Sequence, residues 1–412
     1  MRLVRAGIYF LIAFAVLAHG AVEPWSEAVL EIGAGLLLLL WCAAVLQEEN
    51  PEIRWNPLLW ALGGFWVVTA VQSLAHLTAY PFGTHIEWLK ASALVLLAFL
   101  AVQAFQTAED WRSFVWFLLF FGFAVALFAI VQHYTFNGKL YWVRELRFGG
   151  VPLGPYVDRD HFAGLMELIA PGGLSLMILR GERRELWPML TMFTLLPIGA
   201  LFLSASRGGI ISFLCEVGLL LVLAFYERME ARTLLAGAVV LLLVAGVVGW
   251  IGIGRALERF QQYRGLEVSE GRRLEMTHDS WKIFMDHPVL GTGFGTLQEV
   301  FPKYETLYDG RVVNHAHDDY VELLAEAGIV GGLLALAFLA VLVSRGWKAM
   351  KASRGSLELA LHIGALVACF GMLVHSLVDF NLHIPANALV FLLQAVLATS
   401  IFAPGYLRSA RE

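Results

Sequence analysis

The chain has 412 residues, of which 58% are hydrophobic and only 15% are charged, and its formal net charge is −5. A soluble protein carries about 25% charged residues, so this composition excludes an ordinary soluble fold and indicates a chain that crosses the membrane many times. The sequence has no basic arm or basic helix, which argues against nucleic acid as a partner.

Apolar runs of about 20 residues, long enough to cross a bilayer as helices, recur along the chain. The first is interpreted as a transmembrane helix rather than a cleaved leader, because further spans follow it at once. The predicted fold class is an all-α polytopic membrane protein in which residues 1–412 form a single integral membrane domain. We expect about twelve spans, at residues 6–22, 28–46, 57–78, 88–106, 112–133, 161–179, 188–204, 207–226, 233–253, 319–344, 358–379 and 385–403.

Two long polar connections interrupt the spans, at residues 134–160 and 254–318. The short loops have a charge bias: residues 180–184 contain three arginines, whereas residues 20–27 and 380–384 contain no Lys or Arg. Positively charged short loops stay on the cytoplasmic side, so we expect cytoplasmic N- and C-termini and two long loops on the outer face. An enzyme working there is separated from nucleotide pools and needs a substrate that arrives already activated.

Arginines stand out in two motifs on the outward side. The stretch SASRGG places Arg207 where two spans meet. An arginine beside the bilayer core is usually functional or paired, and its planar fork suits phosphate oxygens. Residues 271–286 have one apolar face and are predicted to form an interfacial amphipathic helix in the large loop, with Arg272 and Arg273 at its start.

Two further stretches belong to these outward loops. The first long loop ends in DRDHF, where Asp160 suits the N-cap of the sixth span and Arg159 is a candidate for binding an anionic substrate. The sequence GTGFG at residues 291–295 resembles a nucleotide-binding loop. Its outward location and the lack of a strand–helix context argue against that function.

The stretch NHAHDDYVELLAEAGIVGG, residues 314–332, places His315 and His317 directly before an apolar span. Asp318 and Asp319 suit the start of that helix, because a carboxylate caps it and complements its dipole. A neutral imidazole can take a proton from a sugar hydroxyl near pH 7, so the histidines are candidate general bases. The same residue types bind Zn²⁺ or Mn²⁺, but the spacing alone supplies no distant third ligand, and we expect no metal.

A last polar motif, HSLVDFNLHIP, follows the eleventh span. His375, Asp379 and His383 are four residues apart and would share one face of a continuous helix. A carboxylate at the membrane edge is a functional candidate, and this one is expected on the same side as His317. Because Pro385 constrains the residues before it, we expect the helix to end before His383.

These motifs, in this order, resemble the O-antigen ligase-like family, which also includes O-antigen polymerases and protein O-oligosaccharyltransferases. His317-Asp318, followed after nine residues by Gly328-Ile329-Val330-Gly331, is similar to the ligase pattern of His, a small amide or hydroxyl residue, nine residues and GxxG; Asp318 departs from it at the second position. The stretches SRGG, RRLEMTHDSWKIFMDHPVLGTGFGTL and HSLVDFNLHIPANAL are also similar to the family. The resemblance covers roughly residues 150–395.

The resemblance implies a GT-C-like glycosyltransferase in the bacterial inner membrane that is metal-independent and needs no other cofactor. Its donor would be a glycan on undecaprenyl pyrophosphate at the periplasmic face. For a ligase, the acceptor would be a sugar hydroxyl of lipid A-core, and the displacement at the anomeric carbon would be inverting. The alternative is a polymerase of O-antigen or exopolysaccharide, which uses the same lipid-linked donor.

The resemblance and the residue chemistry together assign roles to particular side chains. The catalytic candidates are His317, His315 and Asp379. His317 would be the general base, and His315 and Asp379 would position the substrate or tune the basicity of His317. The substrate-binding candidates are Arg207, Arg272, Arg273, Arg159 and His375, and for the pyrophosphate Arg207 would act with either Arg272 or Arg273. A transporter of lipid-linked glycans is disfavoured, because its charged residues would lie at mid-membrane, whereas these cluster at one interface.

Overall fold

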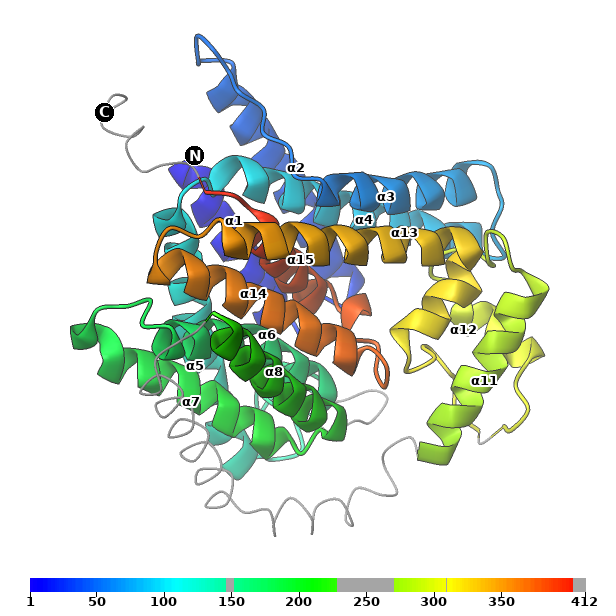
Figure 1. Ribbon diagram of the computed structural model, residues 1–412. Coiled ribbons are helices and arrows are strands. Elements are labelled where there is room, and N and C mark those ends of the chain that lie inside the picture. Colours follow the sequence, from blue (N-terminus) through cyan, green and yellow to red (C-terminus); the bar gives the residue numbers. More distant parts are fainter. Residues whose placement is uncertain (146–151, 228–269, 309, 403–412) are drawn as a thin grey trace.

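The computed structural model of the protein describes residues 1–145, 152–227, 270–308 and 310–402. Within these ranges the chain is helical, and β-structure is limited to two isolated bridges (Figure 1). The helices of the main bundle are α1 (Arg2–Leu17), α2 (Pro24–Val45), α3 (Leu58–Leu74), α4 (Pro81–Ala104), α5 (Ala108–Tyr134), α6 (Arg159–Ile178), α7 (Trp187–Ser204), α8 (Arg207–Tyr226), α13 (Asp319–Lys351), α14 (Ser356–His375) and α15 (Pro385–Thr399).

Eight helices of the described chain are long and apolar enough to cross a membrane, and α3 and α15 are shorter apolar helices. The protein is therefore a multi-pass membrane protein, as its composition indicated. Each expected span within the described residues overlaps one helix of the bundle. The span expected at residues 233–253 lies outside the described residues, so the count of twelve stays a prediction.

Helix α6 lies at the centre of the bundle, and all 20 of its residues are buried. The helices α5, α7, α8, α14 and α15 pack against it. Gly364 of α14 allows one of these close approaches, because a Cβ added there would come within 2.4 Å of the Ser175 hydroxyl oxygen. Small residues at such interfaces let two helix backbones come together. The central position of α6 brings the residues at its N-terminus into the interior at one end of the bundle.

The second long connection folds into a cap at that end. It contains α11 (Glu270–Asp286), α12 (Leu297–Val300) and the 3₁₀ turn η2 (Phe301–Lys303), to the right in Figure 1. Its small core includes Met276, Ile283 and Phe301. The expected amphipathic helix is confirmed as a helix, and Leu274 and Met285 are exposed on its outer face. That face is available for a lipid interface, as the sequence predicts.

Helix α13 is broken at Gly328, where the backbone has φ 59° and ψ −158°. A Cβ at this position would lie 2.4 Å from the carbonyl of Val289, so the site requires glycine. The cap inserts here: the Ile329 amide donates to the Pro288 carbonyl at 2.8 Å. The GxxG motif thus has a structural cause, because it lets the segment after α11 dock into the break in α13.

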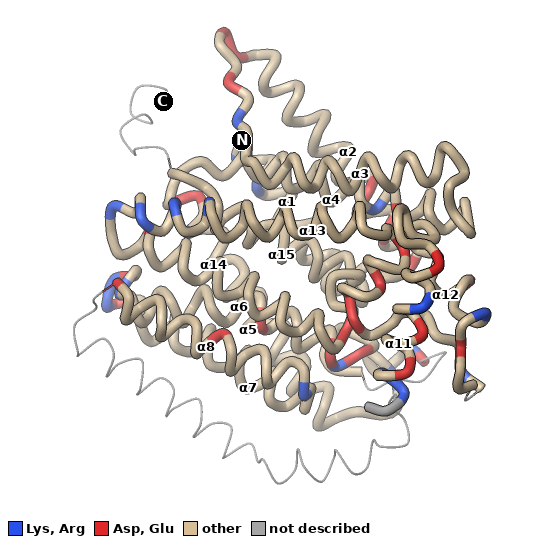
Figure 2. The backbone as a smooth tube through the Cα atoms, turned by 45° about the vertical axis from the view of Figure 1, so that its right-hand side comes forward, with Lys and Arg blue, Asp and Glu red and all other residues tan. Residues whose placement is uncertain are grey.

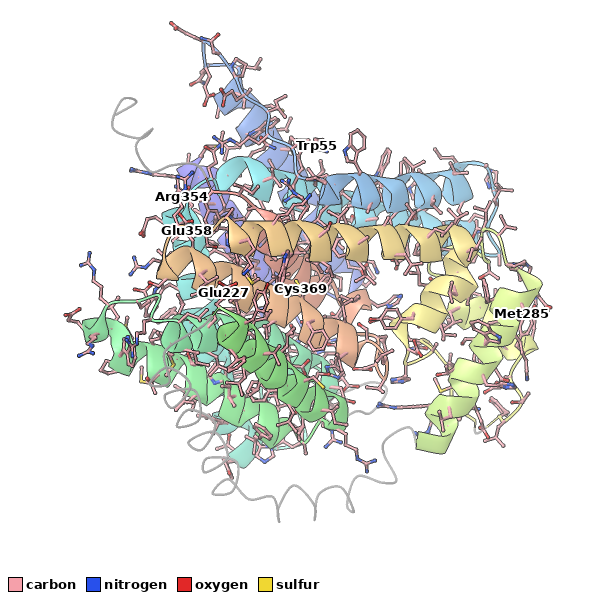
Figure 3. The ribbon with its side chains drawn as sticks, viewed as in Figure 1. Trp55, Glu227, Met285, Arg354, Glu358 and Cys369 are labelled. Atoms are coloured by element: carbon pink, nitrogen blue, oxygen red, sulfur yellow. The ribbon has the colours of Figure 1, made fainter. Side chains whose placement is uncertain are left out.

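Charged residues gather at the two ends of the bundle (Figure 2). Acidic and basic residues gather around α11 and α12, whereas Lys and Arg also mark the opposite end near the α13–α14 connection. At that opposite end Lys351 pairs with Glu227 at 2.6 Å. Met285 and Glu227 lie far apart across the molecule, and Cys369 lies between them within the bundle (Figure 3). The cap and the α13–α14 connection thus lie at opposite ends of the bundle, and the outward orientation of the cap stays a prediction.

Candidate active site

A buried carboxylate, Asp379, lies at the centre of the candidate site, just beyond the C-terminus of α14. Its oxygens lie 3.2 Å from Nδ1 of His317, 3.8 Å from Nε2 of His161 and 4.0 Å from Nε2 of His375. These four residues are the Asp379 cluster. Burial alone would raise the pKa of Asp379, but the hydrogen bond with His317 and the charge of His161 outweigh it and hold the pKa well below its usual range. Asp379 is therefore ionised.

The hydrogen bond to Asp379 fixes the tautomer of His317. An ionised carboxylate only accepts hydrogen bonds, so Nδ1 of the imidazole carries the proton that it donates to Asp379. In the neutral ring the lone pair then sits on Nε2. The side chain of His317 is 13% exposed, so the ring is mostly buried but remains accessible to a substrate. A ring held in this way can accept a proton from a bound hydroxyl group.

The backbone holds His317 in the left-handed region, with φ 54°, which residues with a Cβ rarely adopt. Two interactions fix the chain immediately after it. Asp318 caps α13 by accepting from two amides of its first turn, at 3.0 and 3.1 Å. The Asp319 amide donates to the Ser376 carbonyl at 3.0 Å and ties the start of α13 to the end of α14. Conformations of this kind cluster at functional sites, and this one brings His317 to Asp379.

A second group of titratable residues lies across the ring of Phe380. The centroid of that ring is 4.9 Å from the imidazole of His317 and 4.2 Å from that of His315. Although only one residue separates the two histidines in sequence, they point into different environments. His315 is bonded through Nδ1 to Glu322 at 2.7 Å. The structure therefore does not bring together all the histidines of the motif at one carboxylate.

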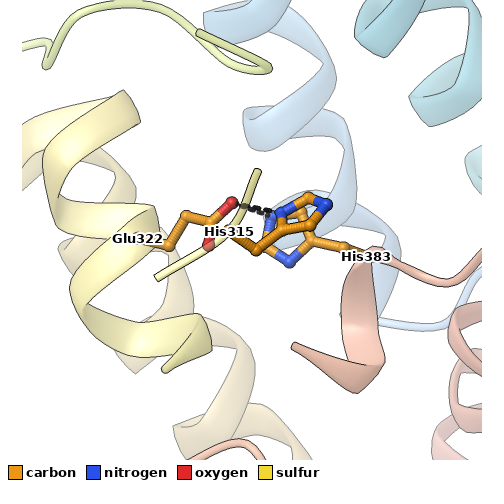
Figure 4. Close-up of side chains that lie close together, drawn as sticks. All are labelled: His315, Glu322 and His383. Atoms are coloured by element: carbon orange, nitrogen blue, oxygen red, sulfur yellow. Dashed lines mark hydrogen bonds and ion pairs between the residues drawn. The ribbon is translucent and has the colours of Figure 1, made fainter. Parts of the chain in front are cut away.

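Glu322, His315, His383 and Asp319 form the Glu322 cluster (Figure 4 shows the first three). Glu322 is 1% exposed, and its Oε1 lies 3.4 Å from Nε2 of His383. The other ring nitrogen of His383, Nδ1, is 2.7 Å from Asp319. Burial would lower the pKa of His383, but the carboxylates of Glu322 and Asp319 raise it to about 10. This cluster links the loop before α13 to the loop before α15.

The three residues His375, Asp379 and His383 do not share a helix face. Helix α14 ends at His375, and His383 lies in the 3₁₀ turn η3 (Asn381–His383). The expectation that the helix ends before His383 is confirmed, and the end comes earlier than the four-residue spacing suggested. His375 is 1% exposed and pairs with Glu167 of α6 at 3.1 Å. It supports Asp379 from within the bundle.

The two adjacent arginines of α11 have different surroundings. Arg272 is 6% exposed and is bound to the Glu305 carboxylate and the Leu307 carbonyl, so it fastens α11 to the segment after η2. Arg273 instead donates to Asp160 at 3.3 Å and to the Val378 carbonyl at 3.1 Å. Its side chain is 28% exposed. Of the two, only Arg273 lies beside Asp379 while keeping access to solvent.

The SRGG motif forms the start of α8. Arg207 is exposed at the first position of the helix, after the N-cap Ser206. A Cβ on Gly208 would lie 2.8 Å from the His375 ring, and one on Gly209 would lie 2.9 Å from a Glu167 oxygen. Both glycines are therefore needed for close packing against the His375–Glu167 pair. This packing places Arg207 at the same end of the bundle as the Asp379 cluster.

The start of α6 differs in detail from the sequence interpretation. Asp158, not Asp160, is the N-cap, and its side chain accepts from the Asp160 amide at 2.8 Å. The reason is that the helix begins two residues earlier than expected for an Asp160 cap. Asp160 is thereby free to pair with Arg273. Arg159 is 5% exposed, in the first turn of α6.

The glycine-rich segment GTGFG is held by a side chain of α13. Glu326 is 2% exposed and accepts from the amides of Gly295, Thr296 and Leu297 at 3.0, 2.8 and 2.9 Å. Within GTGFG the Gly295 amide is directed at this carboxylate, and the amides of Thr292 and Gly293 donate to backbone carbonyls of α13, so these backbone donors already have partners in the protein. This agrees with the interpretation that the segment is not a nucleotide loop.

Some side chains of the site were not found from the sequence. Glu167 is a single carboxylate inside an apolar run, and its pairing with His375 depends on how α6 packs against α14. Asn381 donates to Asp379 at 3.2 Å. The sequence feature that could have identified them is a polar residue inside an apolar segment, because a buried carboxylate or amide needs a partner.

An apolar cavity of about 280 Å³ lies next to the Glu322 cluster, between α3, α4, α13 and α15. Phe65, Leu94 and Phe338 are among its apolar lining residues. Asp319 and His383 also line it. The cavity therefore joins an apolar interior to the polar end of the bundle.

Comparison with known proteins covers part of this site. No curated protein matches the chain. Residues 192–336 match the family model described as O-antigen ligase, and this range includes Arg207, Arg273, His315 and His317. Asp379 lies beyond it, in a segment whose own motif resembles the family. This match and the motifs agree, and together they support an O-antigen ligase-like family for the chain.

Proposed function

We propose that the protein is a glycosyltransferase that moves a glycan from undecaprenyl pyrophosphate to a sugar hydroxyl at the periplasmic face of the bacterial inner membrane. The observation that carries the proposal is the His317–Asp379 pair, 3.2 Å apart at the polar end of a membrane bundle. The family match supports a ligase or polymerase type of function. The separation of charge between the two ends supports the orientation, with both termini in the cytoplasm.

In the proposed reaction the acceptor oxygen attacks the anomeric carbon of the donor glycan. The bond from that carbon to the pyrophosphate oxygen breaks, and its electron pair leaves with the pyrophosphate, which inverts the configuration. Nε2 of His317 takes the proton of the acceptor hydroxyl as the new bond forms. Asp379 keeps the imidazole in the required tautomer and stabilises it once it is protonated. No metal ion or other cofactor takes part in this step.

Arginines would stabilise the negative charge that develops on the leaving pyrophosphate. Arg273 is the better of the two α11 candidates, because it is partly exposed and adjacent to Asp379, whereas Arg272 is buried against Glu305. Arg207 would supply a second cation from the start of α8. Arg159 and His375 are too buried to be the main ligand contacts, and we assign them supporting roles beneath the site.

The apolar cavity supports a lipid-linked substrate. Its lining is suited to a hydrocarbon chain, and Asp319 and His383 connect its wall to the residues near His317. A transporter would need its charged residues along a path through mid-membrane. Here the two clusters lie at one end, where a lipid-linked donor can meet the sugar hydroxyl of an acceptor.

The experiment combines purified protein with an undecaprenyl-pyrophosphate oligosaccharide in EDTA, with and without lipid A-core. Glycan size and carrier are followed by gel electrophoresis and mass spectrometry. Transfer to lipid A-core identifies a ligase. Longer glycan on undecaprenyl pyrophosphate identifies a polymerase of O-antigen or exopolysaccharide, the second candidate, which the same residues would serve. Absence of both products, in EDTA and with added Zn²⁺ alike, contradicts glycosyl transfer to these acceptors, and turnover that appears only with added Mn²⁺ contradicts the metal-free step.

A further inference from the structure

The geometry points to a divalent-cation site formed by His315, Glu322 and His383, with Zn²⁺ as the ion that fits this ligand set. One ligand atom from each residue can be chosen so that all three lie within 4.8 Å of one another. The ligands come from three separate segments: the loop before α13, the first turn of α13, and η3 (Figure 4). The HxHDD spacing supplied no distant third ligand, and the fold supplies two.

The separations suit a small ion. Zinc binds imidazole nitrogen and carboxylate oxygen at about 2.0–2.2 Å, so tetrahedral ligand atoms lie about 3.4 Å apart. Here Oε1 of Glu322 is 3.4 Å from Nε2 of His383 and 2.7 Å from Nδ1 of His315. The shorter distance is that of a hydrogen bond, and binding would replace its proton with the ion. The ion would also displace the Nε2 proton of His383 that faces Glu322, and His315 would move slightly away from the carboxylate to admit it.

The residues around the ligands are arranged as they are around metal sites. A ligating histidine usually donates its other ring N–H to a carboxylate, which fixes the tautomer. His383 has this partner: its Nδ1 lies 2.7 Å from Asp319, so Nε2 is directed toward Glu322. The second oxygen of Glu322 accepts from the Ala316 amide at 2.7 Å. Two of the three ligands are therefore already oriented.

The site is reachable from solution. The side chains of His315 and His383 are 31% and 22% exposed, while Glu322 is buried. Two histidines and one carboxylate leave a fourth position for water in a tetrahedral zinc site. An ion would tie the segment that carries His317 to the segment that carries Asp379, from the far side of Phe380. Its role would be to brace these segments, and the existence of the site does not depend on the proposed glycosyl transfer.

The test measures Zn²⁺ binding directly, without donor or acceptor. Full-length protein in detergent is stripped with a chelator, dialysed and titrated with Zn²⁺ against a chromophoric competitor, and bound metal is counted after gel filtration. We expect one tightly bound Zn²⁺ per chain. Substitution His383→Gln keeps a donor toward Asp319 but removes the ligand, and should weaken binding on the order of 100-fold; Asp319→Asn should weaken it about 10-fold. His287→Gln, an exposed histidine of the same cap, is the matched control.

Two results would overturn the site. One is less than stoichiometric uptake by the wild-type chain, which would mean that the cluster is held by protons and hydrogen bonds alone. The other is the same affinity in wild type, His383→Gln and His315→Gln, which would place the ion elsewhere. Gel filtration of each variant identifies loss of fold, and if His383→Gln fails to fold, His315→Gln provides the same comparison. The titration contains no glycan, so failure to bind Zn²⁺ would contradict the metal site without contradicting the proposed glycosyl transfer.

Discussion

The Asp379 cluster and the Glu322 cluster lie on opposite sides of one phenylalanine ring and are built from the same residue types. In the first, a buried carboxylate holds His317 by one nitrogen and leaves the other for chemistry. In the second, a buried carboxylate lies between two histidines, and one of these is held by a further carboxylate, Asp319. The difference that matters is between two rings: His317 contacts a carboxylate through Nδ1, whereas His383 contacts carboxylates through both Nδ1 and Nε2. A histidine held at one nitrogen suits proton transfer, and a closed group of ligands suits structural bracing.

The sharpest way to break this comparison is to neutralise each central carboxylate in turn. Asp379→Asn removes the negative charge, and its amide can donate as well as accept, so it no longer fixes the His317 tautomer. General-base catalysis is worth about 10²–10⁴-fold, so turnover should fall toward that limit. Glu322→Gln should lower thermal stability more than turnover. Transfer rates and unfolding midpoints of both variants check this, and equal effects on turnover would remove the distinction between the clusters.

The adjacent arginines of α11 give a second comparison, between a structural residue, Arg272, and a proposed substrate-binding residue, Arg273. Arg272→Ala removes a buried arginine and leaves the largely sheltered Glu305 carboxylate without this partner; loss of one partner of a buried pair costs about 3–5 kcal/mol of folding free energy. Arg273→Ala should leave the fold nearly intact and reduce the donor-dependent rate. Thermal unfolding and donor-dependent initial rates separate the two. A stable Arg272→Ala protein with a damaged donor rate would exchange the proposed roles.

Gly328→Ala tests the break in α13. This break sets the direction of the first part of the helix, which contains Glu322. Alanine there would meet the Val289 carbonyl and adopt a backbone conformation essentially confined to glycine, which costs about 1–3 kcal/mol. Gly218→Ala, in α8 with open space around it, is the matched control. Unfolding of both variants checks the prediction, and indistinguishable stabilities would show that the break is not a requirement for glycine.

The smallest effect is expected at Asp279, which lies outside both clusters. Burial would raise its pKa, but hydrogen bonds from Lys282 and Thr306 outweigh it and lower the pKa. A lowered folded-state pKa contributes stability that is present above the unfolded value of about 3.9 and is lost as the pH falls through the folded value. Asp279→Asn should therefore destabilise by about 1 kcal/mol at pH 7, and the gap between the two unfolding midpoints should narrow as the pH falls below the unfolded pKa of about 3.9. A gap that widens as the pH falls would contradict the sign.

Much of this structure could be predicted from local patterns. Apolar runs located the spans, and the chemistry of His317 and Asp379 marked both as candidates before any contact was known. The roles of Arg272 and Arg273 could not be separated, because neighbours on a helix point about 100° apart and the cap alone decides which is buried. The Glu322 cluster also needed the fold, since His383 lies more than sixty residues from His315 in sequence.

The central claim is that His317 is the base of a glycosyl transfer, and a single-turnover measurement tests it most directly. Wild-type and His317→Ala proteins, matched in amount and thermal stability, would be mixed with undecaprenyl-pyrophosphate oligosaccharide and saturating acceptor. The account predicts a rate about 10²–10⁴-fold lower in the variant, with His287→Ala at the wild-type rate. A His317→Ala protein that transfers glycan at nearly the wild-type rate would contradict it.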